Sequence, residues 1–335
     1  MTRLPPITSF ADSLRLVPIA ALALTAALAA APAQAQDPLP QGTINLLVGF
    51  AAGGGADTAA RVVAKKLSEN IGRPVAVQNR AGAGGNIAHQ MTADAAHDGS
   101  TILLGSIGPL SIARHMMKLP YDPERDLAPL TMGVNFPNVL VVPPSLGVKT
   151  VAEYVSLAKS KPGELTYAST GAGSASHLAG EMFNQRAGVE TVHVPYKGRS
   201  QAIIDLIAGR VSAYYSTPST AGPHIQSGKL VALATTGLER PPFMPDLPTI
   251  AESGFKGFNA TNWYAFVAPG RTPVAILDRL NAELAKALND PDVRKQLLDH
   301  GLIPAPGTRE ELRAYIASEA ANWGEVIRER KITAQ

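Results

Sequence analysis

The sequence predicts an α/β protein in which two halves of the chain each place a glycine-rich loop between a strand and a helix. The first unit has an apolar run at residues 44–50, three glycines at 53–55, and a helical apolar stripe over 60–71. The second half repeats this order at 165–187, with its small-residue loop at 170–176. Strands that alternate with helices of about 10 to 15 residues indicate a parallel sheet covered on both faces.

In the first half, Asp57 is placed to cap the first helix, and Gly72 followed by Pro74 is expected to end it. Asp98 and Gly99 are expected to turn the chain between a helix and a strand. The other elements expected in this half are strands at 75–78, 101–105 and 127–134, a helix at 87–96, and a helix opened by residues 106–109.

The loops of this half are suited to an anion. Free backbone N–H groups and about half a positive charge lie at a helix N-terminus that follows a glycine loop. In parallel sheets, ligands bind beyond the carboxyl ends of the strands, which here means the loops 51–56, 82–86 and 106–108.

The second half begins with an apolar run at 139–142, which predicts a strand crossing into a second domain, and a return crossing is expected at 263–268. Thr308 and Glu311 form a capping box that marks the start of the last helix. The remaining expected elements are strands at 165–169, 191–194, 211–215 and 231–235, and helices at 151–160, 177–187, 200–208, around 221–227, 274–288, 291–300 and 308–328.

The N-terminus has the pattern of a secretory signal. Arg3 and Arg15 precede an apolar run over 16–30, and Ala-Gln-Ala at 33–35 matches a cleavage site. The run is shorter than the ~20 residues that span a bilayer. We therefore expect a signal peptide at 1–35 and a periplasmic mature protein.

Composition excludes several function classes. The chain has a net charge of +3, of which residues 1–35 contribute +1, leaving +2 with both signs interspersed. This balance predicts no nucleic-acid partner. The chain contains no cysteine, so neither disulfides nor a cysteine nucleophile are available.

Catalytic and cofactor motifs are missing from the sequence. The loops at 82–87 and 171–176 lack the third glycine of G-x-G-x-x-G, and G-x-x-x-x-G-K-[ST] does not occur. G-x-S-x-G does not occur, and the seven histidines lack metal-ligand spacing. We therefore predict that the protein is not an enzyme, has no catalytic residue, and holds no cofactor and no metal.

Each candidate side chain has a structural alternative. Asp57, Ser106 and Ser174 could simply cap helices rather than contact a ligand. His177 opens a helix beside the second loop, and the Trp263–Tyr264 pair could be core or a cleft wall. Arg80 and Lys197 are cations inside candidate loops, for which solvated surface charge is the default expectation. Tyr214 and Tyr215 alternate faces on a strand, so at most one of them is expected to face the cleft.

Seven motifs, in order along the chain, resemble those of the Bug family, the periplasmic solute-binding proteins of tripartite tricarboxylate transporters. They are GFAAGGGAD at 49–57, QNRAGAGGN at 78–86, LPYDP at 119–123, VPYKG at 194–198, PHIQSGKL at 223–230, DLPT at 246–249 and WY at 263–264.

The resemblance implies a two-domain fold of the type II periplasmic-binding-protein class, with two crossing strands and Venus-flytrap closure. One domain would comprise residues 36–138 and 263–335, the other 139–262, with the ligand cleft between them. It also implies that a small organic acid is held by backbone N–H groups at 52–56 and 170–174. The predicted ligand-binding residues are Phe50, Ala52, Gly53, Gly54, Gly55, Ala56, Asp57, Ser106, Thr170, Gly171, Ala172, Gly173, Ser174, His177, Ser216 and Trp263.

The sequence departs from the family at Ser216, where many members carry an acidic residue. A serine cannot supply that negative charge to a ligand amine. The departure favours plain or aromatic carboxylates, including di- and tricarboxylates, over amino acids.

The expected partners follow from the resemblance. They are the small organic acid and the permease subunits of a tripartite tricarboxylate transporter, with the receptor itself expected to be a monomer. The alternative is a subunit that presents its ligand to a membrane sensor kinase, and the sequence does not separate the two roles.

Overall fold

The computed structural model describes residues 1–2, 38–330 and 332 of the chain. The chain divides after Pro38, and the structure below is that of the unit from Leu39 onward. Apart from Met1 and Thr2, the predicted signal peptide lies outside the described residues.

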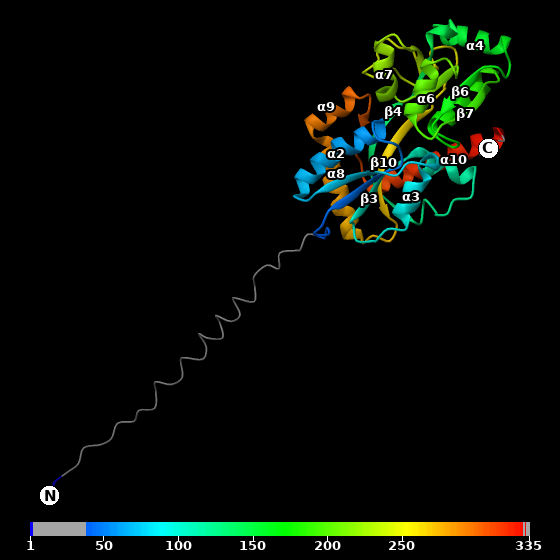
Figure 1. Ribbon diagram of the computed structural model, residues 1–335. Coiled ribbons are helices and arrows are strands. Elements are labelled where there is room, and N and C mark those ends of the chain that lie inside the picture. Colours follow the sequence, from blue (N-terminus) through cyan, green and yellow to red (C-terminus); the bar gives the residue numbers. More distant parts are fainter. Residues whose placement is uncertain (3–37, 331, 333–335) are drawn as a thin grey trace. The chain divides into compact units, whose positions relative to one another are not determined.

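The strands of this unit form two mixed sheets (Figure 1). The six-stranded sheet has the order β11-β4-β10-β3-β1-β2, and the five-stranded sheet the order β7-β6-β8-β5-β9. Their bounds are β1 Ile44–Val48, β2 Val75–Asn79, β3 Thr101–Ser106, β4 Leu127–Pro137, β5 Val139–Val142, β6 Thr166–Ser169, β7 Val192–Pro195, β8 Ala213–Ser216, β9 Val231–Thr235, β10 Thr261–Pro269 and β11 Ile303–Pro304.

The sequence predicts a parallel sheet, but both sheets also contain antiparallel pairs. β1 pairs in parallel with β2 and β3, and β6 with β7 and β8, but β10 is antiparallel to β3 and β4, and β5 is antiparallel to β8 and β9. The cause is the path between the sheets. β4 continues through Asn138 into β5 of the other sheet, and β10 returns to lie beside β4, so these two neighbours run in opposite directions.

Helices cover both faces of each sheet. α2, α8 and α9 share a core with the apolar side chains of β1 and β10, while α3 and α10 lie over the opposite face of the first sheet (Figure 1). On the second sheet, α5 packs on one face and α6 and α7 on the other. Their bounds are α2 Gly55–Ile71, α3 Asn86–Ala93, α4 Val151–Ser160, α5 Ala175–Ala187, α6 Arg199–Ile207, α7 Pro218–Gln226, α8 Val274–Asn289, α9 Pro291–Asp299 and α10 Arg309–Arg330.

The helix expected to open at residues 106–109 is a short π-helical turn, Gly108–Ile112, with Pro109 in its first turn. It packs against α10. No helix among the described residues has the length and apolar character needed to cross a membrane.

Two helix starts test the capping predictions. The prediction that Asp57 caps α2 was wrong, because the cap is Gly54 in an extended conformation and Asp57 lies inside the first turn. At α10 the capping box is confirmed: the Thr308 hydroxyl accepts from the Glu311 N–H at 3.1 Å, and a Glu311 carboxylate oxygen accepts from the Thr308 N–H at 2.7 Å.

We expect Thr308→Ala to lower the free energy of unfolding by about 1 kcal/mol, because the first turn of α10 loses its side-chain acceptor. Thr308→Ser keeps the hydroxyl and serves as the control. Urea denaturation of both variants measures the difference. Equal stabilities for the alanine and serine variants would show that the cap contributes nothing.

Candidate functional site

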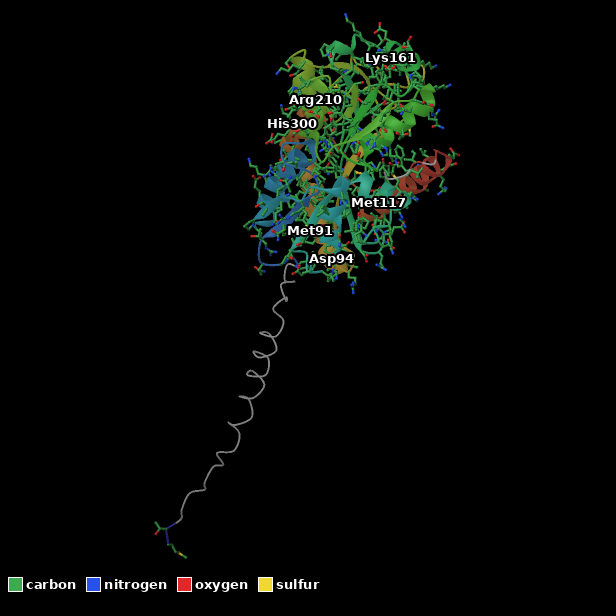
Figure 2. The ribbon with its side chains drawn as sticks, turned by 45° about the vertical axis from the view of Figure 1, so that its right-hand side comes forward. Met91, Asp94, Met117, Lys161, Arg210 and His300 are labelled. Atoms are coloured by element: carbon green, nitrogen blue, oxygen red, sulfur yellow. The ribbon has the colours of Figure 1, made fainter. Side chains whose placement is uncertain are left out.

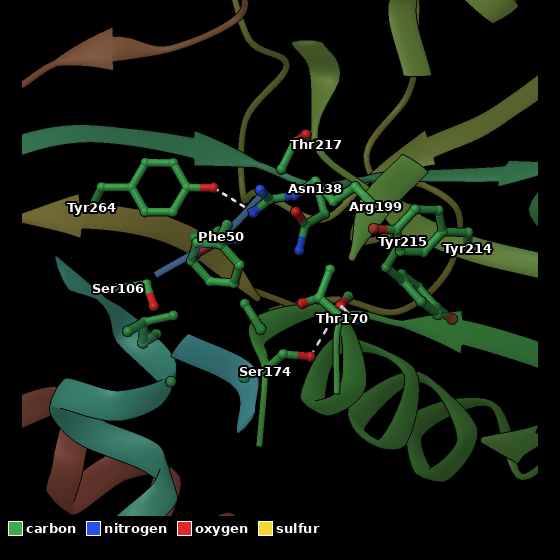
Figure 3. Close-up of a pocket in the computed structure, with 16 residues that line it drawn as sticks. Phe50, Ser106, Asn138, Thr170, Ser174, Arg199, Tyr214, Tyr215, Thr217 and Tyr264 are labelled. Atoms are coloured by element: carbon green, nitrogen blue, oxygen red, sulfur yellow. Dashed lines mark hydrogen bonds between the residues drawn. The ribbon is translucent and has the colours of Figure 1, made fainter. Parts of the chain in front are cut away.

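A small pocket lies where loops from the two sheets meet (Figure 3). The cavity measures about 20 Å³, enough for about one water molecule. Its lining residues are Phe50, Gly84, Ser106, Ile107, Gly108, Asn138, Thr170, Ser174, Ala175, Ser176, Arg199, Tyr214, Tyr215, Thr217, Asn262 and Tyr264.

The first sheet contributes the ends of its central strands. Phe50 follows β1, Ser106 ends β3, and Tyr264 projects from β10. The Phe50 and Tyr264 rings lie 6.4 Å apart, centroid to centroid, and form an aromatic wall. Ligands are expected at the carboxyl ends of parallel strands, and β1 and β3 meet this rule.

The second sheet contributes the starts of its helices. Ser174 caps α5, its hydroxyl accepting from the His177 N–H at 3.3 Å, and Thr217 precedes α7. The Thr170 N–H donates to the Ser176 hydroxyl at 3.2 Å, which closes this loop on itself. The N-terminus of α5, a 13-residue helix, therefore adjoins the pocket with its positive dipole end.

Tyr214 and Tyr215 are both among the residues that line the pocket. Their side chains do alternate, because Tyr215 packs with Phe183 in one core cluster and Tyr214 joins the cluster on the opposite face of the sheet. The alternation that the sequence predicts is therefore present at the end of β8, beside the cavity (Figure 3).

Two neutral groups of the pocket are buried without a hydrogen-bond partner. They are the Ser106 hydroxyl and the side-chain amide nitrogen of Asn138. Asn138 lies between β4 and β5, and its backbone N–H donates to the Thr236 hydroxyl at 2.8 Å. Buried polar groups normally find partners, and both of these can donate a hydrogen bond to a ligand placed in the cavity.

Arg199 is the charged residue among the described pocket lining. It is 8% exposed and opens α6 of the second sheet, yet its Nη2 donates to the Tyr264 hydroxyl on the first sheet at 2.6 Å. No aspartate or glutamate is among the lining residues. The pocket is therefore rich in donors and carries positive charge, which suits an anion.

The glycine loop after β1 lies beside the pocket. Of its predicted site residues, Phe50 lines the cavity, Ala52 and Gly53 are exposed, and Ala56 is buried. Gly54 and Gly55 face the second sheet's elements. A Cβ on Gly54 would lie 3.0 Å from the Arg199 guanidinium, and one on Gly55 would lie 2.8 Å from the Ser219 hydroxyl.

Asp57 holds this glycine loop from behind. Its carboxylate accepts from the Gly53 N–H, Asn79 Nδ2 and Arg61 Nε, each at 3.0 Å. Burial alone would raise the pKa of Asp57, but these hydrogen bonds outweigh it and the pKa lies below its usual value. Asp57 therefore shapes the loop and does not line the cavity.

The second loop is braced in the same way. Thr170 and Ser174 line the cavity, while Gly171, Ala172 and Gly173 lie between them at the contact with the first sheet's loops. His177 Nδ1 accepts from the Gly173 N–H at 3.2 Å, and the His177 ring stacks on His193 at 4.0 Å. His177 supports the loop without lining the cavity.

Two other predicted site residues lie outside the lining. Ser216 is fully buried at the end of β8, and its neighbour Thr217 lines the cavity instead. Trp263 lies on the opposite face of β10 from Tyr264, where its indole N–H donates to Glu319 at 3.2 Å and its ring meets Tyr315 edge-on. Of the two aromatic neighbours, Tyr264 is therefore the one in the pocket.

Family and structure comparisons agree with this architecture. Residues 59–332 match the model of the tripartite tricarboxylate transporter family receptor. The chain belongs to this family of receptors. The Bug resemblance is confirmed by BugT of Bordetella pertussis, 38% identical over 94% of this chain and 97% of BugT.

Solved structures share the fold. Rpa4515 of R. palustris, solved with adipate, is 34% identical with a TM-score of 0.85 over 88% of this chain and 99% of its own. MatC of Rhodopseudomonas palustris, solved with malate, is 31% identical with a TM-score of 0.82 over 86% and 100%. The receptor is thus a periplasmic solute-binding protein with the expected two-lobed α/β fold. Its family consists of receptors, which agrees with the prediction that the protein is not an enzyme.

Several lining residues of the receptor were missed from the sequence. Arg199 was placed just before a helix expected at residue 200, and Asn138 was taken only as a domain boundary. Gly84, Ile107 and Gly108 lie in loops that the sequence had indicated, but they were not chosen individually. Two features of the sequence could have indicated these residues: Asn138 lies at the predicted crossing between the domains, and Arg199 directly follows the VPYKG motif.

His89 joins two of the receptor's pocket loops. Its Nδ1 donates to the Gly85 carbonyl at 2.9 Å and its Nε2 accepts from the Ser106 N–H at 3.4 Å. Burial lowers the pKa of His89 to about 4 and of His193 to about 4, and burial beside His193 lowers that of His177 to about 3. In the described residues, no group of three potential metal ligands accompanies them.

These three histidines predict a loss of stability in mild acid. An unfolded histidine titrates near pH 6.5, so between pH 6.5 and about 4 the unfolded chain takes up protons that the folded chain refuses. The free energy of unfolding should therefore fall as pH drops through this window, by roughly 2 kcal/mol for His89 alone at pH 4.5. Urea denaturation at pH 7.0, 5.5 and 4.5 measures it.

His89→Gln should reduce this pH dependence, while the same change at exposed His300 (Figure 2) should leave it as in the wild type. A stability that stays constant from pH 7.0 to 4.5 would contradict the proposed neutral state of the buried histidines.

Proposed function

We propose that the receptor captures a small carboxylate in the pocket between its two sheets. The observation that carries this proposal is the cavity's lining. It holds two buried donors without partners, one guanidinium, and no acidic residue among the described lining. Donors converging on a small cavity are what a carboxylate requires, because its two oxygens only accept hydrogen bonds.

The donors come from separate elements. Ser106 ends β3, Asn138 sits between β4 and β5, and the α5 N-terminus adds backbone N–H groups near Ser174. Rpa4515 and MatC, whose structures carry adipate and malate, support the same ligand class for this receptor.

Amino acids fit this pocket poorly. An α-ammonium group is best held by a carboxylate, and the described lining contains no aspartate or glutamate. Ser216, on which the sequence-based preference rested, lies outside the lining. The preference for plain or aromatic acids over amino acids therefore rests on the lining as a whole.

Delivery completes the proposed function. The receptor would work in the periplasm after cleavage of residues 1–35 and would pass its ligand to the permease subunits of a tripartite tricarboxylate transporter as a monomer. Its lobes would be residues 36–138 with 263–335, and residues 139–262, closing on the ligand about the crossings at Asn138 and β10. Family membership supports this role.

A thermal-shift screen tests the ligand class. The exported, purified protein is unfolded and refolded to remove bound ligand, then tested with dicarboxylates, citrate, aromatic carboxylates, aspartate, glutamate, phosphate and sulfate. A carboxylate at 100 times its dissociation constant should add about 2.7 kcal/mol of stability and raise the melting temperature by several degrees. A shift with phosphate or sulfate alone would contradict the carboxylate proposal.

Ser106→Ala and Asn138→Ala should each weaken carboxylate binding by about 3- to 10-fold, because each removes one neutral hydrogen-bond donor. Isothermal titration with the carboxylate found in the screen measures the change. Ser227→Ala removes an exposed hydroxyl that donates to the His224 carbonyl and serves as the control. Unchanged affinity in both pocket variants would move the ligand site elsewhere.

A further inference from the structure

Arg199 crosses the cavity from one lobe to the other. Its backbone starts α6 on the second sheet, while its guanidinium reaches three groups of the first sheet's side (Figure 3). Nη2 donates to the Tyr264 hydroxyl at 2.6 Å, and the guanidinium carbon lies 4.7 Å from the Phe50 ring centroid. Nη1 lies 3.0 Å from the position of a Cβ on Gly54.

This guanidinium has no acidic partner within ion-pair distance among the described residues. Two other arginines of the same lobe are paired: Arg210 with Asp205 at 2.7 Å and Arg240 with Glu252 at 2.9 Å. Those two are largely solvent-exposed, where an unpaired charge would cost little, whereas Arg199 is 8% exposed. A buried charge is normally paired with an opposite charge. The chain supplies none within ion-pair distance of Arg199 among the described residues, so we expect a bound anion to pair with it.

We propose that Arg199 binds the ligand's carboxylate directly and restricts the receptor to short carboxylates. This inference rests on the proposed function and names the side chain that selects the ligand. The planar guanidinium offers a fork of N–H donors that matches the two oxygens of a carboxylate, and the hydrogen bond to Tyr264 occupies one of its five N–H groups.

The restriction on length follows from where the side chain lies. Arg199 lines the cavity and spans from α6 to Tyr264, and about 20 Å³ remains free beside it. The Phe50 ring covers one face of the guanidinium and holds it there. A longer acid requires this side chain to leave Tyr264 and Phe50, while a short acid requires a smaller opening of the lobes.

The same position makes Arg199 sensitive to lobe closure. The guanidinium meets Tyr264 and Phe50 only when the second sheet's α6 lies against the first sheet. A carboxylate bound to Arg199 would therefore contact a guanidinium whose position depends on both lobes.

The test compares the wild type with Arg199→Gln and Arg199→Lys by isothermal titration with succinate, adipate and the neutral succinamide. The wild type should bind succinate more tightly than adipate and should not bind succinamide. Arg199→Gln should weaken succinate binding by roughly 10- to 100-fold. It should weaken adipate binding less, and so reduce both the length preference and the preference for the acid over the amide. Arg199→Lys keeps the positive charge but loses the planar guanidinium, so its succinate affinity should lie between those of the wild type and Arg199→Gln.

Arg210→Gln is the matched control, since Arg210 is a surface arginine of the same lobe (Figure 2), and it should bind as the wild type does. Melting temperatures of all variants separate loss of binding from loss of folding. Wild-type affinity for succinate in Arg199→Gln, or tighter binding of adipate than succinate by the wild type, would overturn this inference and leave the carboxylate receptor intact. A wild type that binds no carboxylate would overturn the proposed function itself.

Gly54→Asp provides a second, independent test. Gly54 has φ −92° and ψ 173°, which any residue adopts, and aspartate is favoured at a helix N-cap. The new carboxylate would lie beside Nη1 of Arg199 and pair with it. Succinate binding should therefore be lost with the melting temperature retained. In the Arg199→Gln background Gly54→Asp should change succinate affinity much less, and an equal loss in both backgrounds would overturn the pairing of residue 54 with Arg199.

Discussion

The close approach of main chains between the two sheets is the constraint on which the pocket depends. A Cβ on Gly108 would lie 2.9 Å from the Gly173 carbonyl oxygen, and one on Gly84 would lie 3.4 Å from the carbonyl oxygen of Ala172. The first distance is too short for any side chain. Glycine lets these loops meet through their backbones, so that Ser106 and the α5 N-terminus face a common cavity rather than opposite sides of a filled cleft. The small-residue loops therefore bring two sets of donors together as well as supplying donors themselves.

The pocket loops are stabilised by side chains that contact the loop backbone outside the cavity. His89 and His177 each bond to loop backbone while burial keeps them neutral, and Asp57 neutralises its charge with Arg61 outside the cavity. An acidic support at the cavity would pair with Arg199 and repel an anion, and a cationic support would repel Arg199. The neutral histidines and the paired Asp57 fix the loop conformation without changing the net charge of the cavity. The loop conformation and the charge of the site therefore depend on different residues.

The sequence predicted what local pattern determines and missed what depends on long-range packing. α4 and β9 have the predicted bounds, because hydrophobic period and flanking turn residues act locally. The antiparallel direction of β10 depends on pairing with β4, more than 120 residues earlier, and no local pattern carries it. Four predicted site residues line the cavity: Phe50, Ser106, Thr170 and Ser174. Arg199 was missed because a helix start indicates a surface charge unless the opposite lobe is known.

The two kinds of proposed ligand contact, from loop backbone and from the Arg199 side chain, differ in how freely they can change. Backbone donors at the glycine loops read only the presence of a carboxylate, and their positions are fixed by contacts such as that of Gly108 with Gly173. The side chain at position 199 starts from a helix end and meets the first sheet through the side chains of Tyr264 and Phe50, so a change in its length or charge is expected to leave the glycine loops in place. Capture of carboxylates in general and selection among them would then rest on separate parts of the site. On this division, the glycine loops would define the ligand class, and the residue at position 199 would set which members of the class are bound.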